Sequence, residues 1–583
     1  MFCTVGAAIC LCVIDLQAGQ NNSQNAIMTD VISGSEKRVY IVLILVCIAV
    51  YLTGWCIPLM EVDAVQYANI SSEMLLHKSF LQVFDQGHEY LDKPPMLFWL
   101  SSLSMWVFGI NDGAYRLPSF LFSILSIYST YKLAMLYYPQ RLALLAALIL
   151  ASCQAMFLIN HDVRTDTMLM GWVITSLWQL AAWLKTSQWK NLLLAAVAIA
   201  GGMLTKGPLA LMIPVFAFVP HILLRRDFKD LFRWQYLVLA AVIAILLVPM
   251  SIGLYQQFDL HPEKTVNGLK NVSGLRFFYW TQSFGRITGE NVWHENDSFF
   301  FLLQNMLWSF LPWILFFMGG MIYSVRHLIK QRFLLKPKEE WISMGGFIIT
   351  YCALGSSRAQ LPHYIFVVYP LAAIITAKFV YSLLYTDESR KLLKPLFVTH
   401  VVIFILLGVA LAMLLYFPFP PVPWVGLLWL CVLSVVIVTA IIKKWLPIPA
   451  LITLLVAGVV CINVLLNTGF YPRLLQYQTG IAVNNIIKSH NLQKQQLLVY
   501  KIDAGRSLDF YGNYSFAGVD DTATIRQNNL VLTNDAGLQL LNKNDYRLVY
   551  SGREFHVTKL TLRFLNPAKR YKETKPFYIL QRL

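Results

Sequence analysis

The chain has 583 residues, of which 57% are hydrophobic and only 13% are charged. Soluble domains carry about 25% charged residues, and the mean hydropathy here is +0.56, so the composition excludes a soluble globular protein. The formal net charge of +16 does not indicate a nucleic-acid partner, because membrane proteins concentrate lysine and arginine in their cytoplasmic loops. The nine cysteines lie almost entirely in apolar segments, so the sequence predicts neither a disulfide framework nor a metal site.

Residues 1–20 are apolar, but they lack the positively charged start of a signal peptide. Two interpretations stay open: a short additional anchor, or residues that precede a start at Met28. We assign residues 1–38 to a cytoplasmic N-terminal segment and predict no function for its apolar part, residues 1–20.

Apolar stretches of about 17–25 residues, long enough to cross a bilayer as helices, recur between residues 39 and 468. A shorter apolar piece at 95–109 is more typical of an interfacial or re-entrant helix. We therefore predict an α-helical polytopic membrane protein with about thirteen transmembrane helices. The predicted spans are 39–59, 117–138, 142–160, 166–184, 190–204, 208–224, 235–254, 298–323, 341–355, 364–386, 396–416, 423–442 and 448–468.

The basic residues of the loops support this arrangement. If 95–109 does not cross the membrane, one set of alternate loops carries the clustered lysines and arginines, and the positive-inside rule places that set in the cytoplasm. The opposite face, periplasmic in a bacterial inner membrane, then holds a large first loop at 60–116 and the chain from about residue 469. The predicted cytoplasmic clusters include Lys37, Arg38, Arg141, Lys185, Lys190, Arg225, Arg226, Lys229, Arg233, Arg326, Lys330, Arg332, Lys336, Lys338, Arg390, Lys391, Lys394, Lys443 and Lys444.

The chain changes character at 469–583. QQLLVYKID and YRLVYSG are typical of strands, and NDAGLQLLNK is typical of a short helix with Asp535 near its start. We predict a small periplasmic α/β domain. For its basic tail, which includes Lys569 and Lys572, a solvated surface is favoured over contact with anionic headgroups.

Ionisable residues beside the predicted spans gather on the periplasmic side. Charged groups near a bilayer are costly and indicate function by default, so their clustering on one face predicts a shared site at the membrane surface. They are Asp63, Lys93, Asp166, Lys206, Arg358 and His363.

Asp63 stands in MEVDAVQYANI at 60–70, directly after an apolar run. A cap of the following helix would explain one short polar side chain, but it does not account for Glu61 two residues earlier. A general base needs a carboxylate within hydrogen-bond reach of the proton that it removes. Asp63 is a candidate for that role.

YLDKPPMLFWL at 90–100 holds Lys93 at the start of the short apolar segment, because Pro94 and Pro95 restrict the backbone there. A lysine that anchors a helix end at the interface is one interpretation. A point charge for a phosphate group is the other.

Three further motifs lie on the same face. HDVRTD at 161–166 brings Asp162, Arg164 and Asp166 together, and a helix N-terminus explains only one of the two acids. TKGP places Lys206 in a tight turn between two spans. SSRAQLPHY adds Arg358, His363 and Tyr364, of which a lone histidine is more often a hydrogen-bonding group than a catalyst.

In order, these motifs resemble those of the GT-C superfamily of membrane glycosyltransferases, and most of all the bacterial aminoarabinose transferase and protein O-mannosyltransferase-like branch. The pattern covers about residues 55–370: an acidic E-x-D followed by a tyrosine, then K-P-P, G…RLPS, R-x-D, KGP and LP-x-Y. The predicted spans and periplasmic C-terminal domain also match the aminoarabinose transferase layout.

The resemblance implies transfer of a sugar from a polyprenyl (undecaprenyl) monophosphate carrier to a periplasmic acceptor such as lipid A or a protein. The family's catalytic aspartate matches Asp63 and its second aspartate matches Asp166. The residues expected to bind the substrate or the carrier phosphate are Lys93, Lys206, Arg286, Arg358, Tyr364, Tyr67 and Glu61. The sequence departs from the aminoarabinose transferases at Gln66, where they tend to have arginine, and at Gln282–Ser283, where they have Glu-His.

We expect direct displacement with inversion. Asp63 would remove the acceptor proton, and fixed lysines would stabilise the charge on the leaving phosphate, so neither a divalent metal nor another cofactor is expected. The expected partners are the lipid-linked sugar, a lipid or protein acceptor and membrane lipids, with no nucleic acid and a monomeric chain.

Two other functions fit the sequence less well. A transporter or flippase of a lipid-linked sugar would place its site near the bilayer midplane, often between repeated halves, but here the charges lie at helix ends and no repeat is evident. A non-catalytic assembly partner with a periplasmic interaction domain does not require the ordered acidic and basic motifs.

Overall fold

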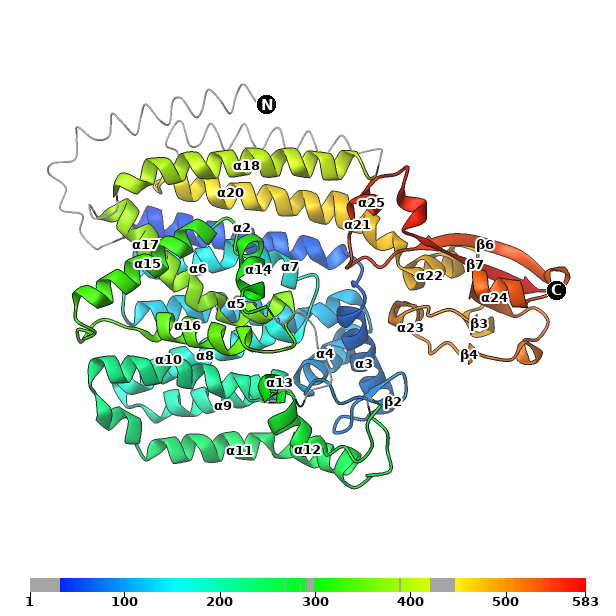
Figure 1. The fold of residues 1–583 in the computed structure, drawn as a ribbon, viewed down its shortest axis with the longest axis horizontal. Helices are drawn as coiled ribbons and strands as arrows, with labels where there is room; N and C mark the ends of the chain where they lie inside the picture. The colour runs from blue at the N-terminus through cyan, green and yellow to red at the C-terminus, as the bar shows by residue number, and fades with distance from the viewer. Residues whose placement is uncertain are drawn as a thin grey trace.

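The computed structural model describes residues 32–266, 268–283, 285–288, 290, 298–386, 390–419 and 446–583. The expectations for residues 1–20 and for a span at 423–442 lie outside these residues. Within them, every predicted span coincides with one helix or with two consecutive helices (Figure 1). These helices are α2 (Gly34–Thr53), α5 (Asp112–Met135), α6 (Gln140–Ser152), α7 (Gln154–Ile159), α8 (Thr165–Thr186), α9 (Trp189–Lys206), α10 (Leu209–Arg225), α11 (Gln235–Leu254), α14 (Phe301–Ser309), α15 (Ile314–Lys330), α16 (Ile342–Gly355), α17 (Tyr369–Tyr385), α18 (Leu393–Tyr416) and α20 (Ala450–Leu465).

Five helical segments of the described chain are long and apolar enough to cross a membrane by length and composition. Several shorter apolar helices accompany them, among them α6, α10 and α16. The chain is a multi-pass membrane protein, and the number of crossings stays a prediction. The five segments are Thr165–Thr186, Gln235–Asp259, Pro362–Tyr385, Arg390–Tyr416 and Ala450–Tyr477.

The centre of the bundle depends on small residues. Helix α8 packs between α5 and α9, and Gly171 permits its approach to α5, because an added Cβ would lie 2.7 Å from Cδ1 of Phe122. Across the same interface the hydroxyl groups of Ser129 and Thr175 lie 2.9 Å apart. Small residues and interhelical hydrogen bonds are the usual means of helix packing in a bilayer, and here they hold α8 against α5.

The segment 60–116 carries short elements at one end of the bundle. Helix α3 (Asp63–His77) is followed by the hairpin β1 (Phe84–Asp85) and β2 (His88–Glu89), and then by α4 (Met96–Phe108). Helix α4 occupies the short apolar piece of the sequence, and Trp106 and Phe108 on it are largely exposed. An interfacial position for α4 remains a prediction.

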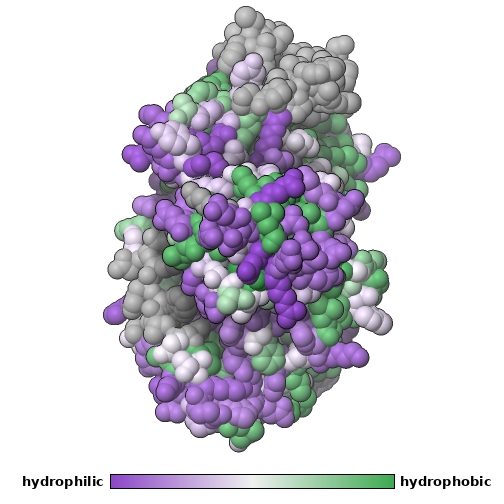
Figure 2. All heavy atoms as spheres, turned by 90° about the vertical axis from the view of Figure 1, so that its right-hand side faces the viewer, coloured by the Kyte–Doolittle hydropathy of each residue, from purple (hydrophilic) through white to green (hydrophobic). Residues whose placement is uncertain are grey.

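The C-terminal region forms a mixed sheet with strand order β4-β3-β5-β7-β6, which confirms the predicted α/β character. Strand β3 is parallel to β4 and β5, and β7 is antiparallel to β5 and β6. The sheet lies beyond one end of the helix bundle (Figure 1), and hydrophilic side chains cover much of that end (Figure 2). The elements of the C-terminal region are α22 (Thr479–Ser489), β3 (Leu497–Tyr500), α23 (Arg506–Gly512), β4 (Gly518–Val519), β5 (Leu530–Asn534), α24 (Asp535–Leu540), β6 (Tyr546–Glu554), α25 (Leu562–Leu565) and β7 (Lys575–Arg582).

Candidate active site

Asp63 and Arg164 form the first ion pair of the candidate site. Asp63 is the first residue of α3, and Arg164 immediately precedes α8. The Arg164 guanidinium donates through Nη1 to Oδ2 of Asp63 and through Nε to Oδ2 of Asp162, the second at 3.1 Å. A guanidinium presents several donors in a rigid fork, so one side chain orients both acids. About a third of the Asp63 side chain (32%) is still exposed, which leaves this carboxylate accessible.

Asp166 and Lys206 form the second ion pair. Nζ of Lys206, at the end of α9, lies 2.5 Å from Oδ1 of Asp166 in the first turn of α8. The Asp166 side chain is only 2% exposed, and Nε2 of His363 approaches its other oxygen at 3.5 Å. The same ammonium group lies 3.8 Å from the centre of the Tyr364 ring, a cation–π distance. The turn after Lys206 requires Gly207, whose φ is +87°.

His363 approaches the second ion pair at Asp166 and lies within electrostatic range of Arg164 in the first pair. The charges of Arg164, Lys206 and Lys93 all act electrostatically on its imidazole, and the charge of Lys93 also acts on Lys206. Residues from the first loop, from the ends of α8 and α9, and from the LPHY turn therefore converge in one region.

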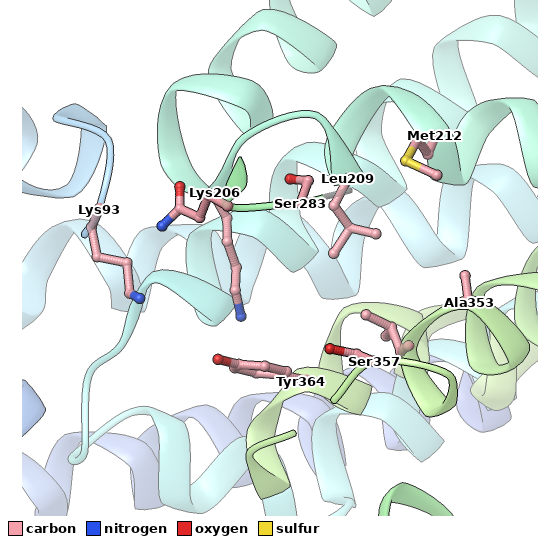
Figure 3. A pocket seen from close by; sticks show the side chains of 10 residues that line it. Lys93, Lys206, Leu209, Met212, Ser283, Ala353, Ser357 and Tyr364 are labelled. Carbon is pink, nitrogen blue, oxygen red and sulfur yellow. The ribbon is translucent and has the colours of Figure 1, made fainter. Parts of the chain in front are cut away.

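A cavity opens beside this cluster and contains about 710 Å³ of space, part of it open to solvent. Lys93 and Lys206 enter it from different segments, and both ammonium groups point toward the side on which the Tyr364 hydroxyl lies (Figure 3). The cavity therefore has a cationic end and an apolar end. The lining residues are Lys93, Lys206, Leu209, Met212, Gln282, Ser283, Ala353, Leu354, Ser357 and Tyr364.

Arg116, in the RLPS motif, holds together two backbone segments that lead to the site. Its side chain is fully buried, and its guanidinium donates to the carbonyl oxygens of Trp55, Pro58 and His161 at 3.1–3.4 Å. These carbonyls belong to the segments that precede Asp63 and Arg164. The sequence signal for this anchoring role was the position of an arginine in an apolar segment, because buried charges must be paired or hydrogen-bonded.

The structure brings together five of the residues predicted for the site: Asp63, Lys93, Asp166, Lys206 and Tyr364. Their roles stay predictions. The Tyr67 side chain is buried and packs against Phe98, with ring centroids 5.9 Å apart. Arg286 belongs to α13 (Gly285–Thr288), but its side chain lies outside the described part of the structure.

Arg358 is exposed and does not line the cavity, so the predicted phosphate contact has no support from its position.

Glu61 also has a different partner from the one expected. Its Oε1 accepts a hydrogen bond from the backbone N–H of Ser507 at 3.0 Å, and its own N–H donates to Oε1 of Gln478 at 2.7 Å. The Glu61 side chain therefore binds the C-terminal domain, because the chain turns between Glu61 and Asp63.

The first residues of α23 extend this contact, which we call the α23 interface and define by Arg506, Ser507, Asp509 and Tyr511. The Arg506 guanidinium forms an ion pair with the Asp85 carboxylate at 2.8 Å, and that carboxylate also accepts from Nε2 of Gln66 at 2.7 Å.

At the other end of the interface the Tyr511 hydroxyl accepts from the Leu59 N–H at 2.7 Å and donates to Asp112 at 2.9 Å. The C-terminal domain thus contacts the chain on both sides of Asp63. Sequence reasoning missed this interface because no local motif marks it.

Among the described residues, no group of three or more histidine, cysteine, aspartate or glutamate side chains is placed to hold a metal ion. The cationic side chains that line the cavity are Lys93 and Lys206, and their ammonium groups are available to a phosphate. The expectation that no cofactor is needed stays a prediction.

Comparison with known proteins places the chain among related sequences and folds. The family model for dolichyl-phosphate-mannose-protein mannosyltransferase matches residues 92–252, a range that includes Lys93, Asp166 and Lys206 but not Asp63. An undecaprenyl phosphate-alpha-4-amino-4-deoxy-L-arabinose arabinosyl transferase from Erwinia tasmaniensis is 30% identical over 264 residues, which cover 44% of each chain. The corresponding enzyme from Edwardsiella ictaluri is 27% identical over 342 residues, 58% of each chain. The chain spans about half the length of these curated relatives.

Among solved structures, ArnT from Cupriavidus metallidurans bound to undecaprenyl phosphate matches with a TM-score of 0.65 and 18% identity, over 89% of this chain and 97% of that chain. The chain therefore has the fold of the GT-C membrane glycosyltransferases. In sequence it resembles the aminoarabinose transferase and protein mannosyltransferase branch of that class, which confirms the resemblance seen in its motifs.

Proposed function

We propose that the chain is a membrane glycosyltransferase that moves a sugar from a polyprenyl monophosphate carrier to an acceptor on the periplasmic side of the bacterial inner membrane. The observation that carries the proposal is a series of ion pairs that leads to a cavity. The accessible carboxylate of Asp63 pairs with Arg164, two residues before Asp166, and Asp166 holds Lys206 at a cavity lined by two lysines and by apolar side chains. A lipid-borne phosphate and a water-facing acceptor can meet in such a place.

The donor would bind with its phosphate between Lys93 and Lys206. Leu209, Met212 and Leu354 line the rest of the cavity and suit an isoprenoid chain. ArnT from Cupriavidus metallidurans binds undecaprenyl phosphate, a carrier of this chemistry. Fixed cations stabilise the charge that develops on a leaving phosphate, and the lysines supply this stabilisation without a metal ion.

Asp63 would act on the acceptor. Its carboxylate takes the proton of the acceptor hydroxyl or phosphate as the acceptor oxygen bonds to the anomeric carbon. The bond from that carbon to the carrier phosphate breaks, and the phosphate leaves with the electron pair. A single displacement of this kind inverts the anomeric configuration, and the hydrogen bond from Arg164 keeps the carboxylate oriented.

Asp166 would act through Lys206. Its contact with the ammonium group at 2.5 Å fixes the lysine at the cavity, so we assign Asp166 a positioning role within the catalytic group.

The acceptor is lipid A or a protein, and the sugar is a pentosamine or a hexose. Mass shifts in lipid A and in periplasmic proteins, compared between wild type and a deletion strain, identify both.

The decisive experiment uses the purified chain in nanodiscs with the carrier-linked sugar so identified. Asp63→Asn should lower the transfer rate by about 10²–10⁴-fold, the usual contribution of a general base, while the affinity for the unglycosylated carrier phosphate stays within twofold. Lys93→Gln should weaken that affinity. Lys391→Gln, an exposed cation on the predicted cytoplasmic side, is the matched control and should change neither quantity.

Full transfer by the Asp63→Asn variant would overturn the assignment of the base. Carrier flipping by the wild-type chain in proteoliposomes, with no sugar transfer, would instead identify a flippase.

A further inference from the structure

The connection between β6 and β7 has an unusual composition. Residues 556–575 contain six lysines and arginines and one acidic residue, Glu573. Glu573 lies 3.8 Å from Arg563, so it offsets only one of these charges. The exposed basic side chains of the segment are Lys559, Arg563, Lys569, Lys572 and Lys575.

Large apolar side chains stand among these cations. Leu562, at the start of α25, is 86% exposed, Tyr571 is 58% exposed and Leu560 is 41% exposed. A single exposed leucine on a protein surface needs no explanation. Three large apolar groups within a strongly basic segment are instead typical of a surface that lies in a membrane interface, where apolar and cationic side chains are both satisfied.

Arg570 fixes the position of this segment relative to the membrane helices. Its guanidinium donates to the Pro418 carbonyl oxygen at 2.5 Å and lies 4.8 Å from the centre of the Phe419 ring. It also lies 5.1 Å from the ring of Phe564 in α25. Pro418 and Phe419 directly follow α18, a candidate membrane span that ends at Tyr416, so α25 lies beside the end of that span (Figure 1).

The end of α18 marks the level of the headgroups. Tyr416 and Phe417 are 69% and 56% exposed, and aromatic side chains at the ends of membrane spans form belts at the interface between lipid and water. Because Arg570 connects the basic segment to Phe419, two residues beyond this pair, the segment is held at the same level.

We propose that residues 556–575 form a headgroup-binding segment that lies on the bilayer. Leu562 and Tyr571 enter the boundary between headgroups and acyl chains. Lys559, Arg563, Lys569 and Lys572 contact the phosphate groups of anionic lipids, toward which clusters of basic residues are attracted within about a Debye length. Arg570 takes no part in lipid binding, because aromatic rings and carbonyl oxygens surround its guanidinium.

This surface is independent of the proposed transfer reaction and depends only on the position of α18 in the membrane. Headgroup contact is thus proposed in place of the solvated surface that the sequence favoured for the basic tail. The segment would fix the height of the C-terminal domain, and with it the α23 interface, above the membrane.

Hydrogen exchange of the full-length chain in nanodiscs tests the proposal. Backbone amides between residues 557 and 572 should exchange at least threefold more slowly in bilayers with about 30% phosphatidylglycerol than in pure phosphatidylcholine. High salt should remove the difference, because it screens charges at the membrane surface. The quadruple variant K559Q/R563Q/K569Q/K572Q should also remove it.

The matched control is K488Q/K501Q/R526Q/R547Q, which removes four exposed cations from other parts of the same domain and should retain the full difference. Equal exchange of the wild-type segment in the two bilayers would overturn the proposal, as would loss of the difference in the control variant. The nanodiscs contain no acceptor, so slower exchange in them identifies the bilayer and not a phosphorylated acceptor as the ligand. Protection that appears only after lipid A or an acceptor protein is added would likewise overturn it.

Discussion

Arg116 joins the two backbone segments that carry the acidic and basic groups of the candidate active site. Its guanidinium binds the Trp55 and Pro58 carbonyl oxygens on one side and the His161 carbonyl oxygen on the other. The first pair precedes Asp63, and His161 precedes Arg164. The ion pair between Asp63 and Arg164, which are 101 positions apart in the sequence, therefore depends on a third residue, Arg116, that binds both backbone segments.

Replacement of Arg116 by lysine tests this role. An ammonium group keeps the charge but cannot reproduce the fork of the guanidinium, so at least one buried carbonyl loses its donor. Each hydrogen bond to a charged group contributes about 1.5–3 kcal/mol, and we expect R116K to lower the free energy of unfolding by about that amount. The rate of sugar transfer should fall by more than tenfold, because small displacements of catalytic groups are costly.

Carrier binding separates positioning from general damage in this variant. Lys93 and Lys206 do not contact Arg116 through any of its hydrogen bonds, so the affinity for carrier phosphate should stay within twofold of wild type. Arg326→Lys, at an exposed arginine of α15, is the control. Wild-type transfer by R116K would show that the carbonyl contacts of Arg116 do not position Asp63 and Arg164.

At the scale of elements, the α23 interface links the C-terminal domain to the start of α3. Glu61 and Ser507, which form one of its hydrogen bonds, are 446 positions apart. Burial raises the pKa of the Glu61 carboxyl above its ordinary value of 4.5, although the hydrogen bonds from Ser507 act in the opposite direction. Burial likewise raises the pKa of Asp509 in the same interface above its ordinary value of 3.8.

The α23 interface should therefore become more stable as the pH falls. A carboxyl group whose pKa is higher in the folded than in the unfolded state stabilises the folded state below its unfolded pKa, and this stabilisation is lost as the pH rises through the folded pKa. We expect the amides of 57–63 and 505–511 to exchange more slowly, after correction for intrinsic rates, as the pH is lowered from neutrality toward about 4.5.

Glu61→Gln retains an oxygen that can accept from Ser507 but has no proton to gain, so the variant should show a weaker pH dependence, and the dependence of E61Q/D509N should be weaker still. Asp520→Asn is the control, because that side chain is fully exposed in the same domain. An unchanged pH dependence in the double variant would assign the effect to other groups.

At the scale of the whole molecule, the sequence predicted what local patterns determine. Within the described residues, helices appear at the predicted apolar stretches and strands appear at both predicted strand segments, because hydropathy and backbone propensity act over short distances. The contacts of Glu61 and Arg116 could not be predicted, since each depends on segments that meet only in the packed structure. Asp63 and Glu61 stand two residues apart in one motif, yet one faces Arg164 and the other faces the C-terminal domain.

The orientation of the molecule in the membrane gives the last prediction. From the clustered lysines and arginines of alternate loops we predict that the end of the bundle with the cavity and the C-terminal domain lies outside the cytoplasm, provided that α4 does not cross the bilayer. Alkaline phosphatase, which is active only in the periplasm, should therefore be active when inserted after Asn111 or fused after Leu583, and inactive after Lys338. Green fluorescent protein should give the opposite pattern.

The insertion after Asn111 is the informative one, because this residue lies between α4 and α5. If α4 crossed the membrane, the phosphatase at that position would be cytoplasmic and inactive, and all later basic loops would lie on the opposite side from Lys37 and Arg38. Asp63, before α4, and Lys206, after it, would then be anchored to opposite faces of the bilayer. The ion pairs that join α3 to α8 and α8 to α9 require one face, so the same packing that forms the cavity favours an α4 that stays on the surface.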